Sequence, residues 1–381
     1  MINVLSIYSI KKRLAQYCAH LPGWRTNRKI VVIESDDWGS IRMPSKVVLN
    51  SLLNKGIRVD QLPYNKYDAL ASEEDLEKLF EVLWSVKDKN GNPAQITANT
   101  IVANPDFEKI ERSGFQEYYF EPFTKTLQRY PRHSNSFFLW QQGIQERVFK
   151  PQLHGREHLN VVRWLNALKN NTGNVRFAFD YKMFDLSESL TISENSFMEA
   201  FNFESLSELD FQKQAIDEGA SLFEELFGYR SRTFIAPCYI WSSKLSKAFK
   251  EYGIEGFQGG WFQKEPVPGR KHRFKKRFNY TGKKTREGQV FLVRNVFFEP
   301  SQNRDVDFVN DALVRIKTAF NMGKPAIISS HRLNFIGYID SSNRDRNLPQ
   351  LKKLLNTITT RWPEVEFMSS DQLLEMILGN E

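Results

Sequence analysis

The sequence contains few cysteines and no long hydrophobic run. Cys18 and Cys238 are the only cysteines among 381 residues, which is too few for a disulfide framework and favours a reducing compartment. No stretch approaches the roughly 18 apolar residues needed to cross a bilayer. Basic residues at 11–13 interrupt the first apolar segment, where a signal peptide would have its core. We therefore expect a cytoplasmic protein without a transmembrane segment, in which residues 1–28 form an N-terminal helical segment.

Two common nucleotide-binding signatures are also missing. No Gly-x-Gly-x-x-Gly follows an apolar run and no Walker lysine loop occurs, which disfavours dinucleotide-binding and P-loop folds. The net charge of +8 comes from residues 264–286, which carry ten basic side chains and one acidic side chain, so the remainder sums to −1. This basic segment could suit nucleic acid, but a solvated hairpin or a rim that attracts an anionic glycan or lipid-linked sugar fits it equally. We expect no nucleic-acid partner.

Short β-branched runs alternate with helical patterns along the chain. The expected strands are Lys29–Glu34, Gln95–Val102, Phe149–Leu153, Arg232–Ala236, Ile254–Gln258, Val290–Phe297, Pro325–Ser329 and Val365–Met368. This alternation predicts parallel strands with right-handed crossovers, and seven or eight such units predict a distorted (β/α)7-8 barrel. An open doubly wound sheet is the alternative. We expect one barrel domain over residues 29–375, with surface insertions around 170–206 and 259–288.

Two adjacent carboxylates, Asp36 and Asp37, follow the first expected strand. In parallel α/β architectures, reactive groups gather at the carboxyl ends of strands. Because successive residues leaving a strand point in different directions, one carboxylate can bind a metal while its neighbour faces the substrate. An Asp-Asp pair is also common in turns and helix caps, which is the structural alternative.

His154 and His158 follow another expected strand with a spacing of four residues. We expect His154 to end that strand and His158 to lie in the first turn of a helix over 157–169. Two histidines and one carboxylate form a common first shell for a catalytic metal. A pair of surface histidines is the alternative.

A third histidine, His331, ends the late strand Pro325–Ser329 and is a candidate general acid. The strand Arg232–Ala236 runs into Pro237, Cys238 and Tyr239, a turn where a backbone N–H could hold an oxyanion. Cys238 has no evident base beside it, and we interpret it as a small buried residue.

The order of these motifs resembles the polysaccharide deacetylase (NodB-homology) family over about residues 29–370. The shared features are Asp-Asp, His-x-x-x-His, a strand ending in Pro-x-Tyr and a late strand ending in His. The resemblance implies a distorted barrel that removes acetyl groups from N-acetylated sugars with a divalent metal, often zinc. It assigns the residues as follows: Asp36 is the base, Asp37, His154 and His158 bind the metal, His331 is the acid, and the N–H of Tyr239 faces the oxyanion. We expect Trp38, Pro237, Tyr239 and Trp261 to bind substrate.

The sequence departs from the family pattern at three places. Trp38 stands between Asp37 and the glycine that usually follows directly. The arginine that precedes the Pro-Pro-Tyr turn in the family is missing, since Ile235 and Ala236 occupy that place. After the strand Ile254–Gln258 the family has an aspartate, where this chain has Gly-Gly-Trp. The residues that would orient the base and the acid are therefore not located by sequence.

The function we expect is metal-dependent hydrolysis, with an N- or O-acetylated sugar of a polysaccharide or glycan precursor, neutral or anionic, as substrate and zinc as the metal. The same histidines with Glu157 also match the His-x-x-Glu-His pattern of a protease, which requires both histidines and Glu157 in one helix. Cleavage of glycosidic bonds by two carboxylates is another alternative. The non-enzymatic alternative is a basic glycan- or nucleic-acid-binding protein on this scaffold.

Overall fold

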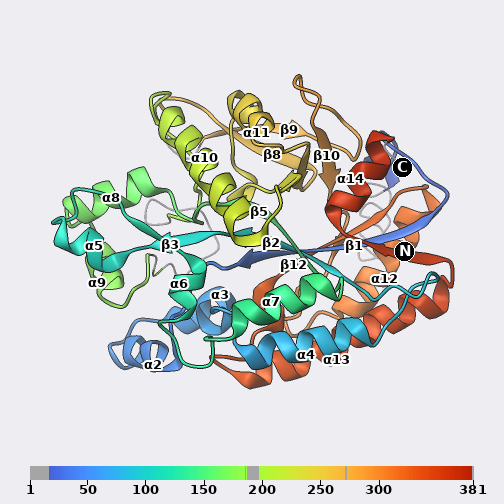
Figure 1. Cartoon of the computed structure of the whole chain (residues 1–381), viewed down its shortest axis with the longest axis horizontal. Helices are drawn as coiled ribbons and strands as arrows, with labels where there is room; N and C mark the ends of the chain where they lie inside the picture. Colours follow the sequence, from blue (N-terminus) through green and yellow to red (C-terminus); the bar gives the residue numbers. More distant parts are fainter. Residues whose placement is uncertain (1–16, 185, 187–196, 271–272, 380–381) are drawn as a thin grey trace, which may run out of the picture.

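The computed structural model describes residues 17–379 apart from 185, 187–196 and 271–272 (Figure 1). The strands are β1 (Lys29–Trp38), β2 (Ile96–Ile101), β3 (Ala103–Pro105), β4 (Phe120–Pro122), β5 (Phe149–Gly155), β6 (Thr233–Phe234), β7 (Gly256–Gly259), β8 (Phe262–Pro266), β9 (Phe274–Phe278), β10 (Val290–Val293), β11 (Val296–Phe297), β12 (Ala326–His331) and β13 (Val365–Met368). The α-helices are α2 (Lys46–Asn54), α3 (Pro63–Tyr67), α4 (Glu73–Trp84), α5 (Phe107–Arg112), α6 (Phe123–Leu127), α7 (Ser136–Gln145), α8 (Val161–Lys169), α9 (Val175–Asp180), α10 (Glu208–Phe227), α11 (Ser246–Glu251), α12 (Phe308–Asn321), α13 (Ser341–Arg361) and α14 (Ser370–Leu378). Four short 3-10 helices complete the set: η1 (Val59–Gln61), η2 (Pro237–Tyr239), η3 (Ser243–Leu245) and η4 (Arg332–Phe335).

The main sheet is parallel and curls into a barrel, as the alternation of strands and helices predicts. Its strand order is β10-β7-β6-β5-β2-β1-β12-β11, and β13 pairs with the start of β1. The two edge strands β10 and β11 belong to one continuous segment, residues 290–297. The first half of this segment pairs with β7 and the second half with β12. One broken strand thus closes the distorted barrel, with Arg294 at the break.

The barrel interior changes from apolar to charged along β1. Alternate residues of a strand share one face, so Ile30, Val32, Glu34 and Asp36 all belong to the face that looks into the barrel. Ile30 and Val32 pack with apolar residues of β10, β12 and α14. Because α14 contacts β1, β6, β7 and β10, it covers the amino-terminal ends of the strands. The carboxylates of Glu34 and Asp36 therefore lie above an apolar layer, toward the carboxyl ends of the strands.

Helices cover the outside of the barrel. The helices α4, α7, α12 and α13 pack on one another and, with the outer face of β1 and β2, form the largest hydrophobic cluster. The helices α10 and α11 cover β5, β6 and β7 on the other side (Figure 1). Ser72 caps α4 through a capping box with Asp75, which is a local signal that the sequence carries.

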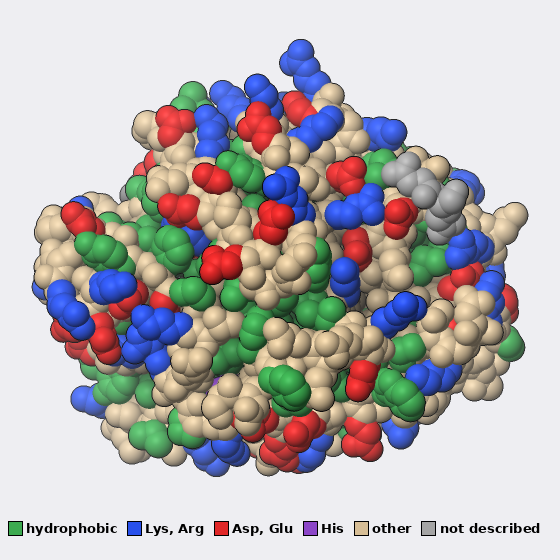
Figure 2. Space-filling view, viewed as in Figure 1, with side chains coloured by type: hydrophobic (Ala, Val, Ile, Leu, Met, Phe, Trp, Pro, Cys, Tyr) green, Lys and Arg blue, Asp and Glu red, His purple; other side chains and the backbone are tan. Residues whose placement is uncertain are grey.

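The two expected insertions differ in character. The first contains α9, and much of it lies outside the described residues. The second forms an antiparallel hairpin of β8 and β9, and the residues of β9 are largely exposed. Figure 2 shows lysine and arginine side chains along the upper edge of the molecule, over β8, β9 and α11. The basic segment is therefore a solvated hairpin, as one of its interpretations predicts.

Several expected boundaries are wrong, and each error affects the site. The strand β1 continues to Trp38, so the two aspartates lie in its last residues and not beyond it. The helix α8 begins at Val161, so His158 lies in a loop before the helix. The expected strand 290–297 is broken in the middle. The N-terminal helical segment lies largely outside the described residues. Among the helices that the structure describes, none combines the length and the apolar character that a bilayer crossing requires.

Candidate functional site

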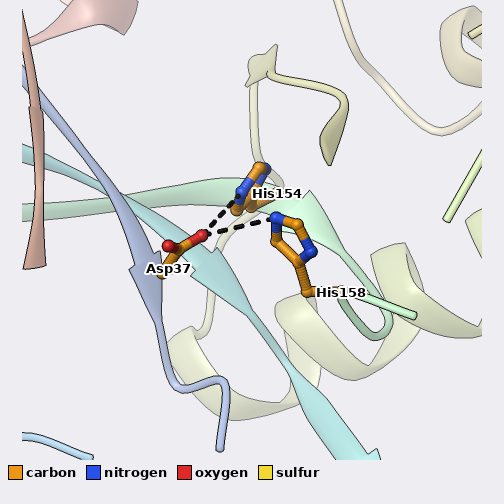
Figure 3. A group of neighbouring side chains, drawn as sticks. All are labelled: Asp37, His154 and His158. Atoms are coloured by element: carbon orange, nitrogen blue, oxygen red, sulfur yellow. Dashed lines mark ion pairs between the residues drawn. The ribbon is translucent and has the colours of Figure 1, made fainter. Parts of the chain in front are cut away.

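Three potential metal ligands converge at the carboxyl ends of β1 and β5. These residues, Asp37, His154 and His158, are called the ligand triad below. Oδ1 of Asp37 lies 3.4 Å from Nε2 of His154 and 3.4 Å from Nε2 of His158. Figure 3 shows the carboxylate of Asp37 directed at both imidazole rings. Among the described residues this is the one group of at least three potential ligands whose ligand atoms all lie within 4.8 Å of one another.

An irregularity in β1 directs Asp37 into the site. The register between β1 and β2 shifts between Ser35 and Trp38, and Asp37 has a φ of +72°. In a regular strand Asp37 would point away from Asp36, but a bulge with a left-handed residue redirects the side chain. Gly39 follows with a φ of +81°, and a Cβ there would lie 2.2 Å from the carbonyl oxygen of Ile101. The backbone therefore requires glycine immediately after the bulge.

Imidazole nitrogens of the ligand triad face the carboxylate of Asp37. Nδ1 of His154 lies 2.8 Å from the carbonyl oxygen of Ile235, so this nitrogen carries a proton and donates it. Its Nε2 is buried with no hydrogen-bond partner among the described residues. Burial lowers the pKa of His158 to about 4, against the opposing charge of Asp37, so this imidazole is neutral at pH 7. A cation bound among the three side chains would pair with the carboxylate and give Nε2 of His154 a partner.

The spacing of the ligand triad fits a small divalent cation. With zinc bonds of 2.0–2.1 Å in a tetrahedral arrangement, two ligand atoms lie about 3.3 Å apart. The two distances of 3.4 Å agree with this value. One carboxylate oxygen and two imidazole nitrogens leave a coordination position open, as catalytic zinc sites do.

Asp36 is held by an arginine that the sequence did not identify. Nη1 and Nη2 of Arg294 donate to the two carboxylate oxygens of Asp36, each at 2.6 Å. Nδ2 of Asn99 donates to Oδ1 of the same carboxylate at 2.7 Å. Burial alone would raise the pKa of Asp36, but the charge and hydrogen bonds of Arg294 lower it to about 2. Asp36 is therefore ionised at any pH at which the protein functions.

A second buried carboxylate shares the same guanidinium. Nε of Arg294 donates to Oε2 of Glu34 at 2.5 Å, and Ser370 donates to Oε1 at 2.8 Å. Burial raises the pKa of Glu34 despite the opposing charge of Arg294. Arg294 and Glu34 are both completely buried, so the pair fixes the plane of the guanidinium beneath Asp36.

His331 stands on the other side of Asp36. Its Nε2 lies 3.8 Å from Oδ2 of Asp36, and its Nδ1 lies 2.6 Å from Oε1 of Glu299. Asn334 donates to the other oxygen of Glu299 at 2.7 Å. Burial would lower the pKa of His331, but the adjacent carboxylate of Glu299 raises it to about 10. His331 is therefore protonated at neutral pH. Glu34, Asp36, Arg294, Glu299 and His331 are called the acid–base cluster below.

The turn after β6 differs from its expected role. The N–H of Tyr239 donates to the carbonyl of Ala236 at 3.0 Å, so it is used within the turn and does not face an oxyanion. The hydroxyl of Tyr239 accepts from Nη1 of Arg294 at 3.3 Å, which places this side chain beside the acid–base cluster. Pro237 is buried in the same turn. Cys238 is half-buried, more exposed than the buried residue that the sequence predicts, and desolvation raises the pKa of its thiol to about 12.

The two tryptophans that we expected to bind substrate lie elsewhere. Trp38 is completely buried, donates to Ser35 at 2.9 Å and packs against Trp140 and Phe149 in the core. The bulge at Asp37 explains this position, because it turns the next residue toward the helices. Trp261 precedes β8, stacks on Phe278 and contacts the ring of His20. In the described part of the chain, the rings of both tryptophans pack on other aromatic rings and not on the histidines of the ligand triad.

The protease alternative is wrong. His154 lies in β5, and His158 lies in the loop between β5 and α8, so no helix holds both. Glu157 is buried and bound by Arg156, with Nε of Arg156 2.5 Å from Oε2. Its carboxylate is thus neutralised within the protein and not free to act on a metal-bound water.

The sequence analysis located the ligand triad, Asp36 and His331, but missed Arg294, Glu299, Glu34 and Asn99. The sequence does carry a signal for Arg294, because this residue interrupts the expected strand Val290–Phe297. Charged residues in buried strands are almost always paired. Glu34 gives a similar signal, because it is an acidic residue that directly follows the apolar run Ile30–Ile33. Glu299 follows β11 directly. The break in residues 290–297, which brings these side chains to the site, has no signal in the sequence.

Known proteins resemble the chain in fold at low sequence identity. No protein-family model matches the sequence, and no curated protein matches it. Among solved structures, 4-alpha-glucanotransferase from Thermococcus litoralis is 10% identical to this chain with a TM-score of 0.47. The match covers 93% of this chain and 40% of the glucanotransferase. A Mycobacterium smegmatis protein assigned to the polysaccharide deacetylases is 11% identical with a TM-score of 0.42, covering 94% and 93%. Puue allantoinase is 11% identical with a TM-score of 0.44, covering 92% and 91%. The chain thus spans less than half of the length of the glucanotransferase.

Proposed function

We propose that the protein is a metal-dependent hydrolase that removes an acetyl group from an acetylated sugar. One observation carries the proposal: three ligand atoms converge beside an ionised carboxylate and a protonated imidazole. Asp37, His154 and His158 suit a divalent cation in number, spacing and protonation. Asp36 and His331 stand 3.8 Å apart beside them. Two titratable groups whose pKa values are pushed in opposite directions are typical of an acid–base pair.

Asp36 is the proton acceptor and His331 the proton donor. With a pKa of about 2, Asp36 is always ionised but weakly basic. A divalent metal held by Asp37, His154 and His158 would lower the pKa of a bound water and polarise the acetyl carbonyl, so that a weak base suffices. Asp36 then takes the proton of the attacking water on a carboxylate oxygen. Nε2 of His331 gives its proton to the departing nitrogen or oxygen, while Glu299 holds Nδ1.

The substrate class rests on the resemblance of the motif order to the polysaccharide deacetylases. The donor set of two imidazoles and one carboxylate favours zinc among common metals. Arg294 and Glu299 support this proposal because they supply, from other positions, the orienting groups that the family motifs lack here. Arg294 binds the base and Glu299 binds the acid.

Replacement of Asp36 by Asn tests the assignment. We expect zinc-loaded Asp36→Asn to retain one metal per chain by elemental analysis, because the ligand triad is intact. Acetate release from N-acetylglucosamine oligomers and from O-acetylated xylan oligomers should be lost. Asp210→Asn, on the exposed face of α10, is the matched control and should behave as wild type. Full turnover in Asp36→Asn would sink the role of this residue, and activity after complete metal removal would sink the class.

A further inference from the structure

Arg42 is a cation at the site that the proposed mechanism does not use. It lies in the loop between β1 and α2, and its guanidinium carbon is 5.5 Å from the centre of the Tyr64 ring. The edge of that ring meets the ring of His331, with centroids 5.4 Å apart. One aromatic ring therefore separates Arg42 from the proton donor.

The far side of Arg42 reaches the opposite wall of the site. Its Nη1 lies 2.7 Å from Sδ of Met198, and the backbone carbonyl of Met198 is 3.8 Å from Sγ of Cys238 in the turn after β6. Arg42 thus lies between Tyr64, which contacts the proton donor, and Met198, which contacts the turn after β6.

Arg42 has no counter-ion in the described part of the chain. No carboxylate there forms an ion pair with it, and its Nε is buried without a hydrogen-bond partner. By contrast, all four arginines that the structure buries almost completely bind carboxylates: Arg156, Arg294, Arg332 and Arg344. Arg42 is only half-buried, so a group from outside can reach its unpaired charge.

The chemistry of the missing partner follows from how this protein uses its arginines. Five of them hold one carboxylate through Nε and Nη2 together: Arg28, Arg58, Arg129, Arg156 and Arg332. Arg42 has no such partner among the described residues. A planar carboxylate matches a guanidinium with two parallel hydrogen bonds.

We infer that the substrate carries a carboxylate close to the acetyl group and that the guanidinium of Arg42 binds it. This inference rests on the proposed function and narrows its substrate to acidic sugars, such as uronic acids. Tyr64 holds Arg42 through a cation–π contact, and Nε2 of Gln302 donates to the Tyr64 hydroxyl at 2.9 Å. The basic segment is exposed and separate, so it does not replace Arg42 in this role.

A pair of substrates that differ only in charge tests the inference. The probes are an N-acetylglucosamine trisaccharide and its counterpart oxidised to the carboxylate at C6. For the zinc-loaded wild type we expect kcat/KM for acetate release to favour the carboxylate by roughly tenfold or more. Arg42→Gln should bring the ratio near one, and Arg42→Lys, which keeps the charge but not the fork, should fall between. Arg273→Gln, in the exposed basic segment, should keep the wild-type ratio.

Binding measurements separate this inference from the proposed function. If neither trisaccharide releases acetate, the deacetylase proposal fails. Calorimetric binding of the same pair to the zinc-loaded protein then decides on Arg42 alone. A preference for the carboxylate that Arg42→Gln removes supports the inference. Equal affinities in the wild type, or a preference that survives Arg42→Gln with full metal content, overturn it, as does a stronger preference for a C6 sulfate ester.

Discussion

The two halves of the site differ in how well the protein alone satisfies their polar atoms. In the acid–base cluster, each charged side chain meets an opposite charge: Arg294 binds Asp36 and Glu34, and Glu299 binds His331. In the ligand triad, Nε2 of His154, which faces Asp37, is buried without a hydrogen-bond partner in the described part of the chain. The first half is complete as folded, whereas the second leaves a ligand atom for a cation.

This difference separates stability from function in the two halves. Removal of one partner of a buried ion pair leaves an isolated buried charge, which strongly destabilises the fold. Unsatisfied metal ligands contribute nothing to folding until the ion binds, when binding adds directly to the free energy of unfolding. Damage to the ligand triad should therefore remove activity with little loss of stability, and damage to the acid–base cluster should affect both.

The largest expected effect follows from the loss of a metal ligand. His154→Ala should lose stoichiometric metal and several orders of magnitude in turnover, because Nε2 of His154 is one of three ligand atoms. In the wild type, free zinc at 100 times its dissociation constant should raise the free energy of unfolding by about 2.7 kcal/mol. Denaturant unfolding with and without zinc measures this gain, which His154→Ala should lack. Asp210→Asn should retain both the bound metal and the zinc-dependent rise in the free energy of unfolding. A zinc-dependent gain of equal size in His154→Ala would contradict the ligand triad.

The sequence predicts that Asp37 and His154 lie together because each ends an expected parallel strand. The strand before Asp37 reads as the apolar run Ile30–Ile33, whereas the strand before His154 mixes apolar residues with Lys150 and Gln152. Parallel strands bring those ends to one edge of the barrel. The barrel itself was predictable for the same reason, from strand–helix alternation.

The acid–base cluster was only half predictable because its supports depend on tertiary geometry. Asp36 and His331 end strands, but Arg294 reaches Asp36 only because residues 290–297 break between two partner strands. The side chain of Trp38 was misplaced for a related reason. A one-residue bulge reverses the facing of all residues that follow it in a strand, and such a bulge has no signature in hydrophobic periodicity.

Arg294→Met should produce the next largest effect. It leaves Asp36 and Glu34 buried without their counter-charge, so we expect a loss of about 3–5 kcal/mol in the free energy of unfolding, measured by denaturant titration. Arg344→Met is the matched control, since Arg344 is equally buried and binds Asp75 away from the site. Both variants should lose similar stability, but only Arg294→Met should lose turnover per folded, metal-loaded molecule. If Arg294→Met does not fold, the same measurements are made on Arg294→Lys, which keeps the positive charge. Equal turnover in the Arg294 and Arg344 variants would show that Arg294 has no part in the chemistry.

The smallest effect is the most specific, since Glu299→Gln alters the charge beside His331 and leaves its neighbours in place. Glu299 raises the pKa of His331 to about 10, so the wild type should keep its proton donor until the pH approaches 10. Without that carboxylate the pKa should fall toward the ordinary value of 6.5, so about 3% of the histidine stays protonated at pH 8 and kcat falls roughly thirtyfold there. The alkaline limb of the kcat profile should move to lower pH accordingly, and Glu299→Asp should restore part of the shift.

The raised pKa of His331 also makes the free energy of unfolding depend on pH. A raised pKa stabilises the fold fully below pH 6.5 and loses this effect as the pH rises through 10, so Glu299→Gln should differ most from the wild type at low pH. An unchanged alkaline limb in Glu299→Gln would mean that another group donates the proton.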